Sequence, residues 1–372
     1  MQNYFFYTKN MTVGYDGVPL IRDIQIEIKR GEILTLIGPN GAGKSTILKS
    51  IIGQLSLLNG KVQLEEVCIN RLSEKERAKR LSVVLTERIH PEMMTCEEVV
   101  AMGRYPYTGR LGILSKTDKK AVQKAMETVR TEELAEKEFL TLSDGQKQRI
   151  LLAKAIAQDP DVLVLDEPTS FLDVRYKLEF LSVLQEMTKK KNLTVIMSLH
   201  ELDLAERISD KILCVKGEYV DRFGPPENVF LPGYIKELYG ITTGTFDECS
   251  GRVELPAVHG IPRMFVIGGN GSGIPIYRRL QREGIPFSAG ILWENDKDTP
   301  VAEALSERVI KEQAYCPIRQ DTVVCAKEEI DRCRHVICTL TDFSEWNKEN
   351  KKLLLYAKDR GKLLEGERIW QK

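Results

Sequence analysis

The fold is decided by one stretch of sequence, Gly38-Pro39-Asn40-Gly41-Ala42-Gly43-Lys44-Ser45-Thr46, which matches the pattern G-x-x-x-x-G-K-[ST]. An apolar run at Glu32–Ile37 comes before it, and a helical pattern follows it. Between a strand and a helix, such glycines let backbone N–H groups curl around phosphates, and the helix N-terminus adds partial positive charge. In this pattern Lys44 reaches the phosphates, and the hydroxyl of Ser45 can ligate Mg²⁺. The stretch therefore predicts a site for the phosphates of a nucleotide.

Short apolar runs recur along the chain up to about residue 240, at Leu81–Leu85, Val162–Leu165 and Thr194–Met197. Runs of this kind suit parallel strands that are buried on both faces. Helical patterns lie between them, and the charged stretches 71–80 and 116–137 are an excursion from the core. We predict an α/β domain over residues 1–255, with an inserted helical subdomain at about 71–158.

Two carboxylates end one of these strands, because Asp166 and Glu167 directly follow Val162–Leu165. Acids at the edge of a buried strand are costly unless they meet a cation or move a proton. Asp166 suits the coordination sphere of Mg²⁺, and Glu167 would polarise the attacking water as the catalytic base. Taken alone, the pair could be solvated acids, but beside the phosphate loop it predicts phosphate chemistry.

The stretch Leu142-Ser143-Asp144-Gly145-Gln146 opens a helical pattern with the S-x-x-Q spacing of a capping box. It also resembles the signature of ABC-type ATPases, whose usual form is L-S-G-G-Q. Further elements of that family follow where the resemblance requires them. Tyr15 matches the aromatic residue that stacks on adenine, Asp173 matches the D-loop, and His200 matches the switch histidine that senses the γ-phosphate. The resemblance covers roughly residues 4 to 255.

The resemblance implies an ATPase with the P-loop NTPase fold of ABC type, which uses ATP and Mg²⁺ and works as a homodimer that sandwiches two ATP molecules. Its catalytic residues would be Glu167, His200 and Lys44, and Mg²⁺ would be held by Ser45 and Asp166. The signature of one chain would contact the ATP bound by the other. The implied ATP-binding residues are Tyr15, Gly38, Pro39, Asn40, Gly41, Ala42, Gly43, Lys44, Ser45 and Thr46, with Ser143, Asp144, Gly145 and Gln146 acting in trans.

Two residues depart from the family's pattern. At the position of the Q-loop glutamine the chain has Thr86, followed by Glu87, so a contact with Mg²⁺ or water would need another water as a relay. In the signature, Asp144 replaces a glycine. A carboxylate aimed at a γ-phosphate would be repelled by several kcal/mol in a dry site, so we expect its side chain to turn away.

Within the family, the region Gly103-Arg104-Tyr105-Pro106-Tyr107-Thr108-Gly109 resembles the importer branch that serves iron–siderophore, haem and cobalamin permeases. The resemblance implies membrane permease subunits as partners and, through them, a solute-binding protein. The alternative is a soluble regulatory ABC-type ATPase that is not coupled to transport. DNA-repair and chromosome-structuring ATPases insert hundreds of coiled-coil residues between the loop and the signature. Only about 96 residues separate the two here, which leaves no room for such an insertion.

Composition sets the remaining limits on function. The 54 Lys and Arg residues balance 54 Asp and Glu residues, which removes the global electrostatic case for binding nucleic acid. Neither a long apolar span nor an export signal is visible. The eight cysteines contain no C-x-x-C pair, which favours reduced thiols over a metal site or disulfides. We expect a cytoplasmic protein that is peripheral on the inner face of the cell membrane.

A second alternation of strands and helices begins after a turn-rich segment and predicts a Rossmann-like, doubly wound α/β domain over residues 256–372. Its first strand ends in the turn Gly268-Gly269-Asn270-Gly271-Ser272-Gly273, which fails the G-x-G-x-x-G fingerprint. Two interpretations stay open: a tight structural turn, or a regulatory site for a small anionic or nucleotide-like ligand. A docking or dimer-stabilising surface is a third role for the domain. The candidate ligand residues are Gly268, Gly269, Gly271, Gly273 and Glu294.

Overall fold

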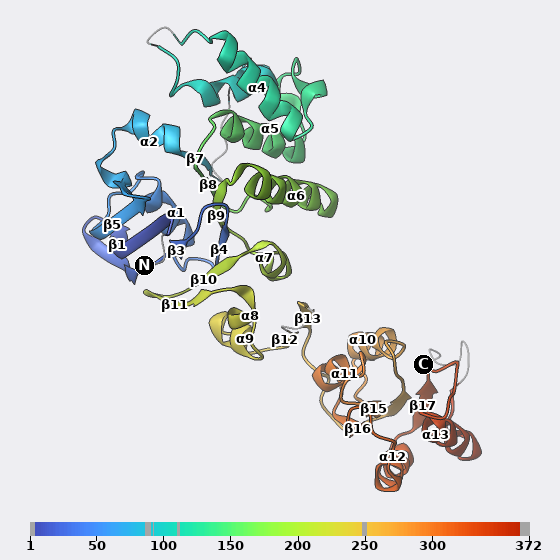
Figure 1. The fold of residues 1–372 in the computed structure, drawn as a ribbon. Coiled ribbons are helices and arrows are strands. Elements are labelled where there is room, and N and C mark those ends of the chain that lie inside the picture. Colours follow the sequence, from blue (N-terminus) through green and yellow to red (C-terminus); the bar gives the residue numbers. More distant parts are fainter. Residues whose placement is uncertain (1–3, 86–90, 92, 110–111, 248–250, 365–372) are drawn as a thin grey trace. The chain divides into compact units, whose positions relative to one another are not determined.

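The computed structural model describes residues 4–85, 91, 93–109, 112–247 and 251–364. The chain divides into two compact units, Met1–Tyr239 and Gly240–Lys372 (Figure 1). The boundary predicted after residue 255 falls inside the second unit. The hairpin of β12 (Thr245–Asp247) and β13 (Arg252–Glu254) belongs to that unit, where Glu254 forms an ion pair with Arg278.

The core of the first unit is a six-stranded sheet in the order β11-β10-β4-β9-β8-β7. All neighbours are parallel except β10 and β11, and every residue of β4, β8 and β9 is buried, as the apolar runs predicted. Parallel strands place their carboxyl ends at the same edge, where ligands bind in such sheets. The strands are β4 (Ile33–Ile37), β7 (Leu81–Val84), β8 (Val162–Leu165), β9 (Thr194–Ser198), β10 (Lys211–Lys216) and β11 (Tyr219–Gly224).

A second, antiparallel sheet lies in the same unit and was not predicted from the sequence. Its order is β2-β1-β5-β6, with β3 paired to β1. The buried face of α1 (Lys44–Ile51) packs between the two sheets, because Ile47, Leu48 and Ile51 share one apolar core with residues of β1 and β4. The strands are β1 (Phe6–Tyr15), β2 (Val18–Ile24), β3 (Glu27–Ile28), β5 (Asn59–Leu64) and β6 (Val67–Cys68).

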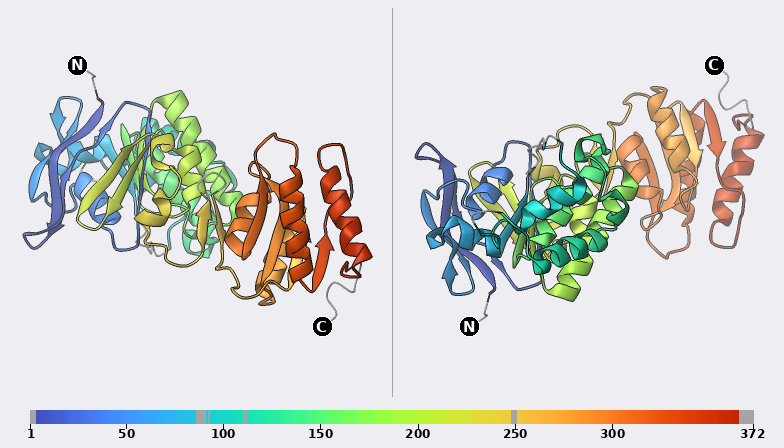
Figure 2. Two further views of the ribbon diagram at one scale, coloured as in Figure 1. Left: turned by 90° about the horizontal axis from the view of Figure 1, so that it is seen from below. Right: turned by 90° about the horizontal axis from the view of Figure 1, so that it is seen from above.

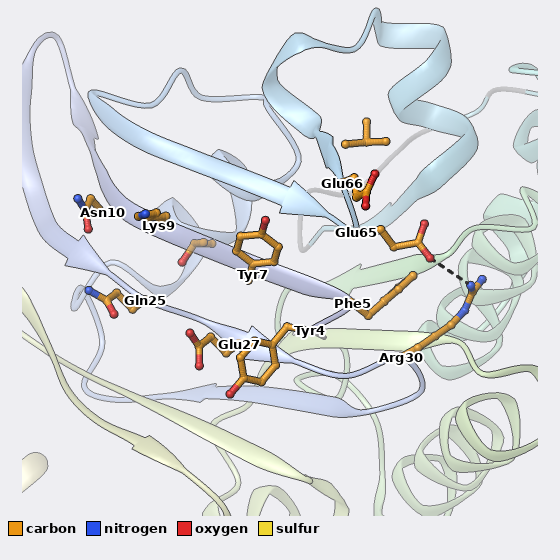
Figure 3. Close-up of a pocket in the computed structure, with 12 residues that line it drawn as sticks. Tyr4, Phe5, Tyr7, Lys9, Asn10, Gln25, Glu27, Arg30, Glu65 and Glu66 are labelled. Carbon is orange, nitrogen blue, oxygen red and sulfur yellow. Dashed lines mark ion pairs between the residues drawn. The ribbon is translucent and has the colours of Figure 1, made fainter. Parts of the chain in front are cut away.

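A hollow of about 990 Å³ lies on this antiparallel sheet (Figure 3). Arg30 closes one end of it, where Nη1 lies 3.7 Å from Oε1 of Glu65 and the guanidinium lies 4.7 Å from the ring centre of Phe5. In the described part of the chain, the hollow is lined by none of the residues that the sequence assigns to the nucleotide.

The predicted helical subdomain contains α3, α4 and α5, which pack against one another, whereas β7 inside the same range belongs to the main sheet. Its helices begin with capping boxes, such as Ser115 with Asp118 and Ser143 with Gln146. The helices of the first unit are α1, α2 (Glu74–Arg80), α3 (Cys96–Ala101), α4 (Lys116–Thr128), α5 (Asp144–Ala157), α6 (Val174–Lys191), α7 (Leu202–Ile208), α8 (Pro226–Val229) and α9 (Tyr234–Leu238).

The second unit is a parallel sheet in the order β16-β15-β14-β17, with helices on both faces (Figures 1 and 2). One apolar core joins α10 and α11 to the sheet, and another joins α12 and α13 to its opposite face. This is the doubly wound arrangement that the sequence predicted. The elements are β14 (Met264–Ile267), α10 (Ile274–Arg282), β15 (Phe287–Trp293), α11 (Thr299–Leu305), β16 (Arg308–Glu312), α12 (Gln320–Arg332), β17 (His335–Cys338) and α13 (Lys348–Asp359). Among the described residues, no helix is long and apolar enough to cross a bilayer.

A buried ion pair ties the helical subdomain together. Nε of Arg104 lies 2.9 Å from Oδ1 of Asp118, and Nη1 donates to the carbonyl oxygen of Ala157 at 2.8 Å. Both charged side chains are less than a tenth exposed. Hydrogen bonds from Ser115 and from Arg104 hold the pKa of Asp118 below its usual value. The pair therefore joins the segment after α3 to both α4 and α5.

We predict that Arg104→Ala lowers the free energy of unfolding of the first unit by about 3 kcal/mol, because it leaves the carboxylate of Asp118 buried without its partner. Urea titration followed by far-ultraviolet circular dichroism measures the change. The control is Arg175→Ala, which removes an exposed pair with Glu179 and should change the stability far less, because solvent screens that pair. Equal costs for the two variants would contradict a stabilising role for the buried pair.

Candidate functional site

The phosphate loop connects β4 to α1 and depends on glycine at two points. Gly38 has φ 147°, and a Cβ there would lie 2.3 Å from the carbonyl oxygen of Val215 on β10. Gly43, the N-cap of α1, has φ 97°. Residues other than glycine rarely adopt such backbone angles. The chain must turn sharply between the end of the buried strand β4 and the start of α1. The glycines allow the backbone angles that this turn needs.

Lys44 fills the loop from inside. Its Nζ donates to the carbonyl oxygens of Gly38 at 2.7 Å and Pro39 at 3.1 Å, and the residue is 5% exposed. Burial lowers the pKa of Lys44, and the charges of Glu167 and Asp166 oppose that effect. An ammonium held by carbonyl oxygens can exchange them for phosphate oxygens, which carry more negative charge.

The carboxyl end of β8 places two acids beside this loop. Asp166 is buried, and its Oδ1 accepts a hydrogen bond from Oγ of Ser198 at 2.7 Å. The same Oγ accepts from the backbone N–H of Glu167 at 2.9 Å. Ser198 ends β9, the strand next to β8, so one hydroxyl fixes the positions of both acids.

His200 and Glu167 meet directly. Nε2 of His200 lies 2.6 Å from Oε1 of Glu167, and Oγ of Ser170 donates to Oε2 of Glu167 at 3.2 Å. Glu167 has φ 48°, which turns the chain sharply after Asp166. The structure thus brings together Lys44, Asp166, Glu167 and His200 at one sheet edge. A carboxylate oriented by an imidazole can accept a proton from water.

Tyr15 ends β1 near the start of α1. The residue is 49% exposed, and its Oη lies 3.1 Å from Oγ1 of Thr46, so the ring is anchored at its hydroxyl end and accessible to solvent. A planar base could stack on such a ring. Strand β1 of the antiparallel sheet therefore places an aromatic ring beside the phosphate loop.

The predicted signature forms the start of α5. Ser143 is its N-cap, and the Ser143 hydroxyl accepts from the backbone N–H of Gln146. Ser143 and Asp144 are exposed, whereas Gly145 is buried, where a Cβ would lie 3.0 Å from the ring of Tyr176. This helix start is therefore open to a second molecule, although its glycine is packed against α6.

Asp173 caps α6, because its Oδ1 accepts from the backbone N–H of Tyr176 at 2.9 Å. The structure thus gives the predicted D-loop residue a local role at a helix terminus. The predicted Q-loop residue, Thr86, and the neighbouring Glu87 lie outside the described residues.

Two residues of this site were missed by the sequence analysis. Ser198 had a signal, since it is a hydroxyl residue at the end of a buried strand, two positions before His200. Tyr239 had none: its Oη accepts from the backbone N–H of Gly38 at 3.1 Å, across 201 residues of sequence. Burial raises the pKa of Tyr239 to about 12, so its hydroxyl stays protonated. Both residues hold the positions of groups that the motifs supply.

The arrangement fits a magnesium nucleotide. Mg²⁺ prefers oxygen ligands and is usually bound by one or two protein oxygens together with phosphates. The Asp166 carboxylate and the Ser45 hydroxyl are oxygen donors of this kind. The helix N-terminus and the Lys44 ammonium offer positive charge to the phosphates.

The predicted ligand turn of the second unit has a different chemistry. The backbone N–H of Asn270 donates to Oδ1 and Oδ2 of Asp296 at 2.9 and 3.0 Å. The N–H of Gly273 donates to Oδ2 of the buried Asp298 at 2.9 Å. Gly268 and Gly269 are also buried, while Glu294 is exposed. Carboxylates of the chain itself thus accept hydrogen bonds from backbone N–H groups that a bound anion would need.

Comparisons with known proteins agree with the geometry of the first unit. Residues 21–170 match the family model described as ABC transporter. The chain is 44% identical to an uncharacterised ABC transporter ATP-binding protein, MJ0873, of Methanocaldococcus jannaschii, over 77% of this chain and 99% of that protein. It is 33% identical to the cobalamin import ATP-binding protein BtuD of Halobacterium salinarum, over 77% of this chain and 73% of that one.

The iron(3+)-hydroxamate import ATP-binding protein FhuC of Bacillus subtilis is 35% identical, over 63% of this chain and 87% of its own length. Among solved structures, CbiO1 of Clostridium perfringens, part of the transporter complex CbiONQ, has a TM-score of 0.56 at 26% identity, covering 63% of this chain and 94% of that one. These matches confirm the predicted P-loop NTPase fold of ABC type. Residues 287–366 match a separate family model, the MJ0874 family.

We predict that Ser198→Ala lowers the free energy of unfolding by about 1–3 kcal/mol, because it leaves one oxygen of Asp166 and the N–H of Glu167 without a shared partner. The ATPase rate should fall as well, since both acids lose their fixed positions. Thermal denaturation and a phosphate-release assay measure the two effects. The exposed Ser182→Ala on α6 is the control, and a Ser198→Ala protein as stable and active as that control would contradict the assignment.

Proposed function

Since the chain belongs to the ABC transporter ATP-binding family and is an ATPase of that family, we propose that it energises import of an iron–siderophore, haem or cobalamin type solute through a membrane permease. The relatives named for iron(3+)-hydroxamate and cobalamin import support this proposal. The observation that carries the ATPase part of it is the 2.6 Å contact between Nε2 of His200 and Oε1 of Glu167, beside the phosphate loop and Asp166.

The hydrolytic roles follow from the contacts of this chain's own residues. Glu167 takes the proton of the attacking water, and His200 orients its carboxylate. Lys44 releases the loop carbonyl oxygens and binds phosphate instead. Ser45 and Asp166 would hold Mg²⁺, which supplies positive charge that neutralises the phosphates.

We propose a homodimer as the working state. The N-terminus of α5 is open in the single chain, because Ser143 and Asp144 are exposed. A helix N-terminus carries partial positive charge, which suits a phosphate bound to a second copy of the chain. Each of two ATP molecules would then lie between the phosphate loop of one chain and the Ser143–Gln146 segment of the other.

Exposed apolar side chains on the helical subdomain support the permease as a partner. Met102 is about half exposed, and Tyr105 and Ile113 are more exposed still. They belong to the segment that follows α3, which contains the importer-like stretch. Exposed apolar side chains are a common component of protein interfaces. The chain would then be peripheral on the inner face of the cell membrane.

The first test of this proposal is Glu167→Gln. We predict that it lowers the rate of ATP hydrolysis by about 10²–10⁴-fold, because the amide cannot accept the proton. ATP affinity should stay near that of the wild type, since the loop and Lys44 are intact. Steady-state kinetics and equilibrium binding of ATP separate the two effects, with the exposed Glu227→Gln as control. Wild-type hydrolysis by Glu167→Gln would eliminate Glu167 as the base.

The second test separates an importer subunit from a soluble regulatory ATPase. We predict that the tagged chain co-purifies with a polytopic membrane permease from its own cells. The double variant Met102→Ala, Tyr105→Ala should lose that partner yet keep its basal ATPase activity. Tyr219→Ala, which removes an exposed tyrosine of β11, is the control. Recovery of an active ATPase without any permease would favour the soluble alternative.

A further inference from the structure

A pocket of about 360 Å³ opens at the carboxyl edge of the sheet in the second unit. Each of the four loops that follow the strands contributes to its wall. Asn270 follows β14, Trp293 and Asp296 lie at the end of β15, Tyr315 follows β16, and Trp346 follows β17. Ligands of doubly wound domains bind at this edge, and the volume lies in the range of small-molecule sites.

Three aromatic side chains form the apolar part of this wall. Trp293 is held in place, because its indole Nε1–H donates to the carbonyl oxygen of Cys316 at 2.7 Å. Tyr315 and Trp346 are 82% and 62% exposed. Tyr315 also has φ 61°, a conformation that is rare and strained for an aromatic residue. Two large rings thus stand open to solvent in the same wall as a fixed one.

The polar part of the wall presents the carboxylate of Asp296 at the glycine turn, where a phosphate would need hydrogen-bond donors. Asp296 lines the pocket and already accepts hydrogen bonds from the backbone N–H groups of Asn270 and Asp298. The buried Asp298 lies behind it, on the N–H of Gly273. The remaining lone pairs of the Asp296 carboxylate can accept from a ligand. Lys297 also lines the pocket, so the lining carries one charge of each sign.

We propose that this pocket binds a planar nitrogen heterocycle that is cationic or donates N–H groups, and that carries no phosphate. Aromatic faces attract flat rings and cations. The carboxylate of Asp296 selects a positive charge or an N–H donor. At the glycine turn, where a phosphate would usually bind, the backbone N–H groups already donate to Asp296 and Asp298. The site is separate from ATP hydrolysis in the first unit, and its ligand differs from the anionic or nucleotide-like one that was one of two open interpretations of the glycine turn.

The full chain reports binding through its own fluorescence. All three tryptophans, Trp293, Trp346 and Trp370, belong to the second unit, and two of them line the pocket. The probes are 1-methylnicotinamide, a flat cation; benzimidazole, a flat N–H donor; and nicotinamide mononucleotide, in which a ribose phosphate replaces the methyl group on the same nicotinamide ring. We expect saturable quenching by the first two and at least tenfold weaker binding of the mononucleotide.

Two variants identify the groups responsible. Tyr315→Ala removes an exposed ring and should weaken 1-methylnicotinamide about fivefold to tenfold. Asp296→Asn keeps an oxygen for the N–H of Asn270 and should weaken it at least about tenfold. The exposed Leu355→Ala on α13 is the control and should bind as the wild type does. Circular dichroism shows that each variant is folded.

Three outcomes would overturn the proposal. They are quenching that stays linear with 1-methylnicotinamide and benzimidazole, mononucleotide binding as tight as that of the flat cation, and unchanged affinity in both pocket variants. A change in oligomeric state with Tyr315→Ala, without binding of either heterocycle, would instead assign the exposed rings to a contact between copies of the chain. Each result is independent of whether the ATPase drives transport.

Discussion

The structure depends on a charge balance at one edge of the six-stranded sheet. The buried ammonium of Lys44 lies in the field of Asp166 and Glu167, and burial and these charges act on its pKa in opposite directions. None of these groups would be stable alone in such a setting. Ser198 and Tyr239 complete the arrangement, because the first positions both acids and the second holds the first glycine of the loop. The parallel strands β4, β8 and β9 are what bring them together.

The two units use the same architectural position in opposite ways. In each, a glycine-rich turn follows a buried strand and leads into a helix at the carboxyl edge of a parallel sheet. In the first unit a lysine lies inside the loop, and its ammonium donates to two carbonyl oxygens that a phosphate can replace. In the second, carboxylates of the chain itself accept from the turn. Similar glycine patterns therefore predict different ligands once the neighbouring acids are known.

The helical subdomain shows how a surface can be held rigid while it exposes apolar groups. Arg104 and Asp118 form a buried pair, and the capping boxes satisfy N–H groups at the helix starts. Met102 and Tyr105 flank the buried Gly103 and Arg104 and point to solvent. Of these adjacent residues, Arg104 stabilises the interior of the subdomain, while Met102 and Tyr105 form part of its exposed face. This division suits a subdomain that meets another protein, as the proposed function requires.

The sequence by itself determined the fold class, because the phosphate loop, the acid-ended strand and the signature are contiguous motifs whose local geometry follows from residue type. It also determined the doubly wound second domain, whose strand β14 is an unbroken, buried apolar run between predicted turns and helices. Only the tertiary structure decided the antiparallel sheet, whose pairing joins β1 to β5 across some 50 residues, and the contacts of Tyr239 with Gly38. The aromatic pocket was equally invisible, because its residues come from four loops. Sheet topology alone places them together, and no short stretch of sequence records which loops will meet at one edge.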